Sequence, residues 1–200
     1  ADTWAARLAA NPKDFESVAK LAQARYWIGS NRLPEPERKG AMEAGISAAR
    51  IAIALNPLRP EAHFWLAANM GALAESYGLR QGIKYRGQIK DALLTTLKLD
   101  PAFLDGSADR ALGRWYYKVP GLFGGSNKQS ETYLRKSLTY NPNSIISHIF
   151  LAETLADMGR KDEARKEAQA AIDAPFDPNW TPEDKRFKET AKRLLRDLQR

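Results

Sequence analysis

The 200-residue chain contains no cysteine, which excludes disulfide bonds, thiolate zinc sites and cysteine nucleophiles. Valine, one of the β-branched residues that favour sheets, occurs only as Val18 and Val119, so strands are not expected. Long apolar runs are also missing. The least polar stretch, residues 46–55, is interrupted by Arg50 and is far shorter than the roughly 20 apolar residues that cross a bilayer. The sequence therefore predicts no membrane-spanning segment.

Alanine is abundant instead, with 31 residues, and this composition favours helices. Hydrophobic residues make up 44% and charged residues 28% of the chain, which is typical of a soluble folded protein, and the length suits a single domain over residues 1–200. The net charge of +7 attracts anionic partners in general. Charge alone does not choose among nucleic acid, lipid headgroups and an acidic ligand.

Five Asn-Pro or Asp-Pro pairs punctuate the chain at nearly regular intervals. Their prolines are separated by 45, 44, 41 and 36 residues and stand at Pro12, Pro57, Pro101, Pro142 and Pro178. Proline has no backbone donor and restrains the residue before it, so each pair predicts the end of a helix. Between consecutive pairs, the pattern predicts two helices.

This periodicity predicts an all-α array of about four helix pairs with a capping helix. The predicted parts are a partial helix at 1–12, repeat units at 13–57, 58–101, 102–142 and 143–178, and a capping helix at 179–200. The spacing of small and apolar residues within these units resembles that of the tetratricopeptide repeat. The residues that carry this resemblance are Leu112, Gly113 and Tyr116, then Leu151, Ala152 and Leu155, then Ala164, Ala168 and Ala171. Gly113 is expected where two helices approach closely.

Local signals predict where individual helices begin and end. Ser144 is expected to cap one helix, Gly159 to end it and Asp162 to cap the next. The first three intervals, of 45, 44 and 41 residues, exceed the 34-residue period of the tetratricopeptide repeat, and the last falls near it. We therefore expect loops at residues 30–39 and 78–87, inserted between the helices of each pair.

Catalytic motifs are hard to find. His63 and His148 occupy equivalent repeat positions, so both are interpreted as packing residues rather than as ligands of one site. The glycine-rich segment 121–128 lacks the Gly-Lys-Ser/Thr ending of a phosphate-binding loop. We therefore predict no catalytic residue, no metal site and no cofactor.

Consecutive aromatic residues are a stronger signal. Neighbouring side chains on a helix point about 100° apart, so the aromatic runs that begin at Tyr26, Phe64 and Trp115 cannot face the core entirely. In tetratricopeptide arrays, the first helix of each pair lines the concave face. That frame places a candidate ligand site at Arg110, Arg114, Lys118 and Tyr117, with walls from Tyr26, Trp27 and Phe64.

Three of these residues form a cationic stripe. Arg110, Arg114 and Lys118 are spaced by four, so they share one helical face as exposed cations. The stripe either solvates the helix or holds an anion or carboxylate between aromatic walls. A second candidate is the loop at residues 119–128, because Leu122 and Phe123 are too apolar to stay in water without a purpose. These two residues are expected either to fold back or to meet a partner.

A closer resemblance covers about 60 residues. The run Ala-Leu-Gly-Arg-Trp-Tyr-Tyr-Lys-Val-Pro-Gly-Leu-Phe-Gly-Gly at 111–125 resembles the T-component proteins of TRAP transporters. It is also similar to the regulator-of-microtubule-dynamics proteins, which share an aromatic, histidine-containing helix comparable to residues 62–67. The resemblance implies a helical repeat fold and partner binding without catalysis. For the transporter relatives, it also implies a periplasmic location.

The sequence thus predicts a non-catalytic binding or adaptor module. Its expected partner is a protein, a peptide or a small organic anion, with a link to a transport system if the transporter resemblance holds. The alternative is a scaffold or nucleic-acid-binding protein that uses its basic surface, although the basic helix at the C-terminus offers only Phe187 for base stacking. Self-association is left open.

Overall fold

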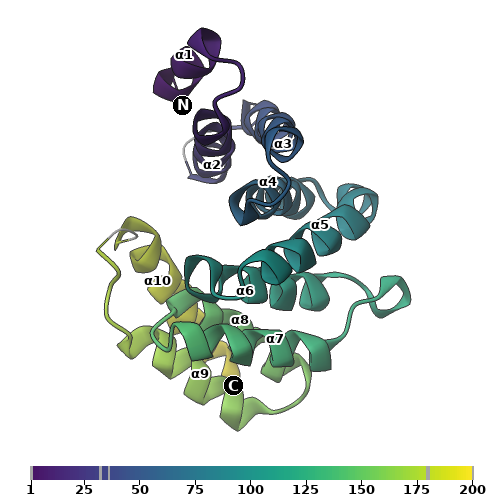
Figure 1. Cartoon of the computed structure of the whole chain (residues 1–200). Helices are drawn as coiled ribbons and strands as arrows, with labels where there is room; N and C mark the ends of the chain where they lie inside the picture. Colours follow the sequence, from purple (N-terminus) through teal and green to yellow (C-terminus); the bar gives the residue numbers. More distant parts are fainter. Residues whose placement is uncertain (1, 32, 36, 179–180, 200) are drawn as a thin grey trace. The chain divides into compact units, whose positions relative to one another are not determined.

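The computed structural model describes residues 2–31, 33–35, 37–178 and 181–199. Over these residues the structure is helical and contains no strand (Figure 1), which confirms the all-α prediction. The elements are α1 (Asp2–Ala10), α2 (Phe15–Asn31), α3 (Glu37–Leu55), α4 (Pro60–Tyr77), α5 (Leu79–Leu99), α6 (Phe103–Lys118), the 3-10 turn η1 (Gly121–Phe123), α7 (Asn127–Tyr140), α8 (Ile145–Asp157), α9 (Lys161–Asp173) and α10 (Thr181–Leu198). None of the described helices is long and apolar enough to cross a membrane.

The helices are arranged in pairs between the proline markers. Each unit between two proline markers contains two helices, from the pair α2 and α3 to the pair α8 and α9, with α1 before them and α10 after them. The chain also divides into two compact units, Ala1–Phe103 and Leu104–Arg200. Each compact unit has its own buried residues.

In the first compact unit, α2 packs on α3, α3 on α4 and α4 on α5. Buried alanines at the contacts, such as Ala22 and Ala49, let the helices approach closely. Asn69 ties two of them together, because its side-chain amide donates to the carbonyl oxygen of Ala22 at 3.1 Å and to that of Trp65 at 2.8 Å. A polar side chain at the centre of this core is therefore used to fix the position of α4 against α2.

The predicted loop at residues 78–87 is wrong. Gly78 alone separates α4 from α5, with φ 79° and ψ −171°, and α5 begins directly after it. Tyr85 and Ile89 are buried at a spacing of four, so the segment already has an apolar helical face. The residues by which this unit exceeds the repeat period therefore lie within α5 and lengthen that helix. By contrast, the connection expected at 30–39 is present but shorter than predicted, because α2 ends at Asn31 and α3 begins at Glu37.

The second compact unit begins with a left-handed turn. Leu104, Asp105 and Gly106 have φ of 46°, 53° and 77°, so the regular turns of α6 follow them. Hydrogen bonds between hydroxyl groups connect α7 to α8 inside this unit. The hydroxyl oxygens of Ser130 and Thr154 lie 2.9 Å apart, and those of Ser137 and Ser147 lie 3.0 Å apart. These small buried side chains keep two helices close while satisfying each other's hydrogen bonds.

Two of the three predicted helix ends are confirmed. Ser144 caps α8, since its hydroxyl accepts from the backbone N–H of Ser147, and Gly159 follows α8 with φ 77°. Asp162 does not cap α9, because the helix begins one residue earlier, at Lys161, and Asp162 lies within its first turn. The capping helix α10 buries Ala191, as its apolar spacing predicts.

The two histidines share one structural role. The Nε2 atom of His63 donates to the carbonyl oxygen of Pro57 at 2.8 Å, and that of His148 donates to the carbonyl oxygen of Pro142 at 2.9 Å. Each proline belongs to an Asn-Pro marker, so each histidine fastens a helix to the turn that precedes it. The interpretation of both residues as equivalent packing residues fits this geometry.

His148 differs because its second nitrogen, Nδ1, lies 2.6 Å from Oε2 of Glu167. A carboxylate and a backbone carbonyl have no proton to donate, so Glu167 and Pro142 together favour a histidine ring that is protonated on both nitrogens. Burial alone would lower the pKa of His148, but the hydrogen bonds to Glu167 and to the carbonyl of Pro142, with the charge of Glu167, raise the pKa above its ordinary value.

We expect this contact to make stability depend on pH. A raised pKa in the folded state gives a stabilisation that is complete below the ordinary histidine pKa, about 6.5, and is lost as the pH rises through the folded-state value. Urea unfolding should therefore show the advantage of the parent over His148→Gln shrinking as the pH rises from 6 towards 9. Glu167→Gln should remove most of this trend, and an equal trend in that variant would refute the contact as its source.

Candidate functional site

The predicted ligand-site residues divide between the two compact units. Tyr26 and Trp27 lie on α2, with Phe64 on α4, in the first unit. The three cations and Tyr117 lie on α6 in the second unit. They are therefore described as two separate faces.

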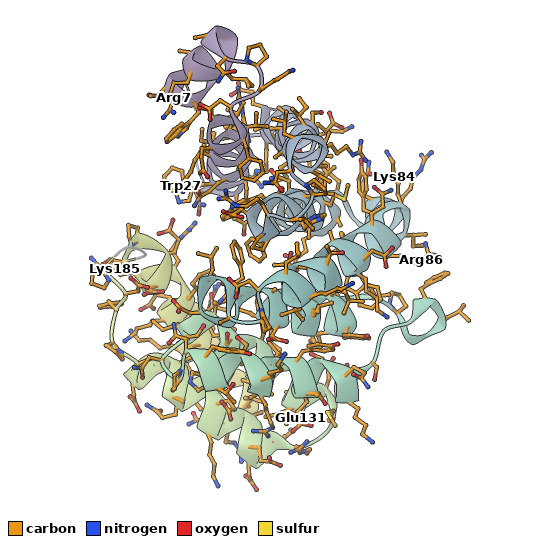
Figure 2. The ribbon with its side chains drawn as sticks, in the orientation of Figure 1. Arg7, Trp27, Lys84, Arg86, Glu131 and Lys185 are labelled. Atoms are coloured by element: carbon orange, nitrogen blue, oxygen red, sulfur yellow. The ribbon has the colours of Figure 1, made fainter. Side chains whose placement is uncertain are left out.

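In the first unit, the aromatic side chains form a row. Tyr26 packs against Trp65 with ring centroids 5.7 Å apart, Trp65 against Phe64 at 5.0 Å, and Phe64 against Phe103 at 5.2 Å. Phe64 is only 7% exposed, so it supports the row from within. Tyr26 and Trp27 are half-buried, and Figure 2 shows Trp27 extending from α2. These two residues are the members of the predicted wall that solvent reaches.

In the second unit, Arg114 of the stripe contacts side chains of two helices. Its guanidinium forms an ion pair with Glu153 of α8 and lies 4.2 Å from the ring centroid of Phe150 and 5.6 Å from that of Tyr117. The Arg114 side chain is 19% exposed, so it is not the exposed cation that the spacing predicted. Aromatic stacking and a charged partner hold the guanidinium in one orientation.

The rest of the stripe surrounds this pair. Lys118 is exposed, with Nζ 5.3 Å from the ring centroid of Tyr117, and Arg110 donates to the hydroxyl of Ser107 at 2.8 Å. Burial raises the pKa of Tyr117 to about 12, and the nearby carboxylates of Asp157 and Glu153 add to this effect. Tyr117 is neutral at physiological pH, as any tyrosine is, and the raised pKa keeps it neutral in more alkaline solution as well.

Sequence reasoning missed the contributions of Phe150 and Asp157, both on α8. The signal was present, because Phe150, Glu153 and Asp157 follow one another at spacings of three and four and so share a helical face. This face meets the cationic stripe of α6. The two helices together form a surface of alternating charge with aromatic rings between the charges, which we call the α6–α8 face.

Backbone hydrogen bonds close the loop between α6 and α7. Pro120 accepts hydrogen bonds from the N–H groups of Phe123 at 2.8 Å and Gly125 at 3.2 Å, and Tyr116 accepts one from Ser126 at 2.9 Å. Figure 1 shows this segment, residues 119–125, projecting away from the two helices, and we call it the projecting loop. At its tip Leu122 is 90% exposed, so it does not fold back on the array.

The described residues contain no group of three or more histidine, aspartate or glutamate side chains that could hold a metal ion. What the α6–α8 face offers is hydrogen-bond donors, acceptors and aromatic surface at fixed positions.

Comparisons with solved structures establish the repeat fold. TTC0263, a thermophilic TPR protein of Thermus thermophilus, superposes with a TM-score of 0.70 at 20% identity, covering 96% of this chain and 87% of that one. MamA gives a TM-score of 0.60 at 18% identity and covers 94% and 87% of the two chains. YrrB, described as a TPR protein with an unusual peptide-binding site, gives 0.58 at 17% identity and covers 98% and 90%. The fold is therefore a tetratricopeptide-like helical repeat.

Comparison with curated proteins finds no match. The family model described as "Regulator of microtubule dynamics protein 1-3" matches residues 4–123. This segment covers more than half of the chain, from α1 to the tip of the projecting loop. The chain therefore belongs to the family of regulator of microtubule dynamics proteins 1-3.

Proposed function

We propose that the chain is a non-catalytic adaptor that binds a protein or peptide segment on the α6–α8 face. The observation that carries the proposal is the environment of Arg114, which is paired with Glu153 and stacked near Phe150 and Tyr117. Fixed charges of both signs beside aromatic rings match a polypeptide, whose amides and side chains present donors, acceptors and apolar groups together. The peptide-binding site named for the structurally similar YrrB is consistent with this use of the fold.

A small organic anion suits this face less well. The carboxylates of Glu153 and Asp157 lie beside the cations, so a compact anion would meet repulsion as well as attraction. In the first unit, we propose Tyr26 and Trp27 as further contact residues for a polypeptide ligand. A transport link and a periplasmic location find no support in the geometry of either unit, so we do not propose them.

The nucleic-acid alternative depends on α10. Its exposed cations are interspersed with acids, as in the pair of Lys192 with Glu189 at 2.7 Å, and Phe187 is half-buried against the apolar core. Single-strand binding needs exposed aromatic rings between the cations. The arrangement on the described part of α10 lacks them, which favours the protein or peptide ligand.

Replacing Arg114 with alanine tests the proposal. Wild-type protein is used to select binders from a displayed library of 12-residue peptides, and the enriched peptides are titrated against each variant. We expect Arg114→Ala to weaken binding about tenfold to a hundredfold, since a hydrogen bond to a charged group contributes roughly 1.5 to 3 kcal/mol. The variant should also melt at a lower temperature, because Glu153 loses its partner.

The control is Lys192→Ala, which removes the same charge from α10 and should leave peptide affinity unchanged. Single-stranded DNA and citrate, titrated at two salt concentrations, test the other two ligand classes. Failure to enrich any peptide, or equal affinity of the enriched peptides for the parent and for Arg114→Ala, would refute binding on the α6–α8 face.

A further inference from the structure

The tip of the projecting loop exposes an apolar side chain. Leu122, at 90% exposed, is more exposed than any other large hydrophobic residue that the structure describes, and Phe123 beside it is 37% exposed. Single apolar residues on a surface are normal, so exposure alone does not identify a contact. Leu122 is set apart by the backbone of the loop, which holds it at the tip.

The loop is built to hold Leu122 in one place. Its 3-10 turn is closed by the bond from Phe123 to Pro120, and Gly124 follows in the left-handed region with φ 101°. Gly125 passes so close to the backbone of Val119 that a Cβ there would lie 1.6 Å from its carbonyl oxygen. An anchor that is already rigid loses little conformational entropy when it binds, which favours tight association.

The charged residues nearest to the loop in the sequence have one sign. The sequence from Arg110 to Ser130 contains four cations and no aspartate or glutamate. Two of the four, Lys118 and Lys128, flank the loop and are exposed. A partner surface that extends from Leu122 to the two ends of the loop therefore meets lysines, and the surface complementary to them is acidic.

A protein fits this pattern better than a membrane does. Anchoring at a bilayer takes two hydrophobic signals, or one together with a cluster of about four to eight cations, whereas the loop offers one fully exposed apolar residue between two lysines. Protein interfaces concentrate their binding energy in one or a few apolar anchors within a polar rim. The projecting loop has this composition.

We infer that the projecting loop anchors an acidic amphipathic helix of a partner protein. Leu122 packs into the apolar stripe of that helix, and Lys118 and Lys128 pair with carboxylates on either side of the stripe. This inference rests on the proposed adaptor function, and it assigns the loop a contact separate from the α6–α8 face. Phe123, the next residue, is 37% exposed and adds apolar surface beside Leu122.

The test uses a synthetic 18-residue amphipathic peptide with leucine on one face and glutamate on the other, and a matched peptide in which lysine replaces every glutamate. Fluorescence anisotropy should show binding of the acidic peptide only. Leu122→Ser should weaken that binding at least tenfold, and Lys128→Glu should weaken it and reduce its salt dependence. Leu58→Ser changes a leucine that is 73% exposed in the first unit and should bind like the parent.

Several results would overturn the inference: no binding of the acidic peptide, equal binding of the basic peptide, or undiminished binding to Leu122→Ser. Binding to phosphatidylcholine vesicles containing phosphatidylserine that depends on Leu122, without peptide binding, would assign the tip to a membrane instead. Arg114→Ala separates the two proposals. If library-selected peptides lose affinity for that variant while Leu122→Ser has no effect on any peptide, the adaptor function stands and the loop anchor fails.

Discussion

Replacing Gly113 with leucine is expected to lower the free energy of unfolding by about 3 kcal/mol, at the upper end of the usual cost of overpacking. The residue lies where α6 meets α7: a Cβ at this position would lie 2.5 Å from Cγ of Leu134 and 3.2 Å from the carbonyl oxygen of Ser130. Leu134 is fully buried and cannot rotate into solvent. For a chain of this length, the loss corresponds to a fall of roughly 6 to 12 °C in melting temperature, measured by circular dichroism.

Two further variants identify the cause. Gly87→Leu also replaces a helical glycine, but nothing lies within 4 Å of a Cβ there, so its melting temperature should stay the same or rise. The double variant Gly113→Leu, Leu134→Ala returns volume to the contact and should be more stable than Gly113→Leu alone. Equal melting temperatures for Gly113→Leu and the parent would show that the two helices do not meet at Gly113.

The second large effect is expected for Gly125→Ala in the projecting loop. A Cβ at this residue would lie 1.6 Å from the carbonyl oxygen of Val119 and 2.6 Å from its carbonyl carbon, and both are backbone atoms that no side-chain rotation can move. The loop must open, which breaks the bonds from Gly125 to Pro120 and from Ser126 to Tyr116. Ser126, whose hydroxyl caps the start of α7, is displaced as well. The free energy of unfolding is therefore expected to fall by roughly 2 to 4 kcal/mol.

Hydrogen exchange measures this change directly. The amides of Phe123, Gly125 and Ser126 should lose protection in Gly125→Ala, and the rigid presentation of Leu122 should be lost with them. Gly121→Ala is the matched control, because it lies in the same loop with nothing within 4 Å of a Cβ. Protected amides and an unchanged melting temperature in Gly125→Ala would contradict the close passage of this loop against Val119.

The candidate site was only partly readable from the sequence. The repeat frame placed Arg114 on the first helix of its pair, and the residue lies on that helix, α6. The partners that decide its chemistry, Glu153 and Phe150, are 39 and 36 positions further along the chain. Helical periodicity describes one helix at a time, so it indicated a stripe of exposed cations where the structure contains a stacked ion pair.

The loop at 78–87 shows a similar limit within one element. The excess over the repeat period suggested an inserted loop, yet α5 continues through Gly82 and Gly87. A glycine costs a helix only about 1 kcal/mol, and the buried side chains of Tyr85 and Ile89 offset that cost by packing against the core. Local propensity could not show this gain, because it depends on surfaces supplied by other helices.

The sequence by itself determined the helical repeats, the proline-marked turns and the equivalent histidines. These features depend on backbone restraints and on residues a few positions apart, which any local segment carries with it. The tertiary structure alone decided that Arg114 pairs with Glu153 of α8, that Gly113 lies directly against Leu134 and that Leu122 is exposed to solvent. Exposure, pairing and close approach depend on which distant surfaces meet, and packing of the whole unit selects those surfaces.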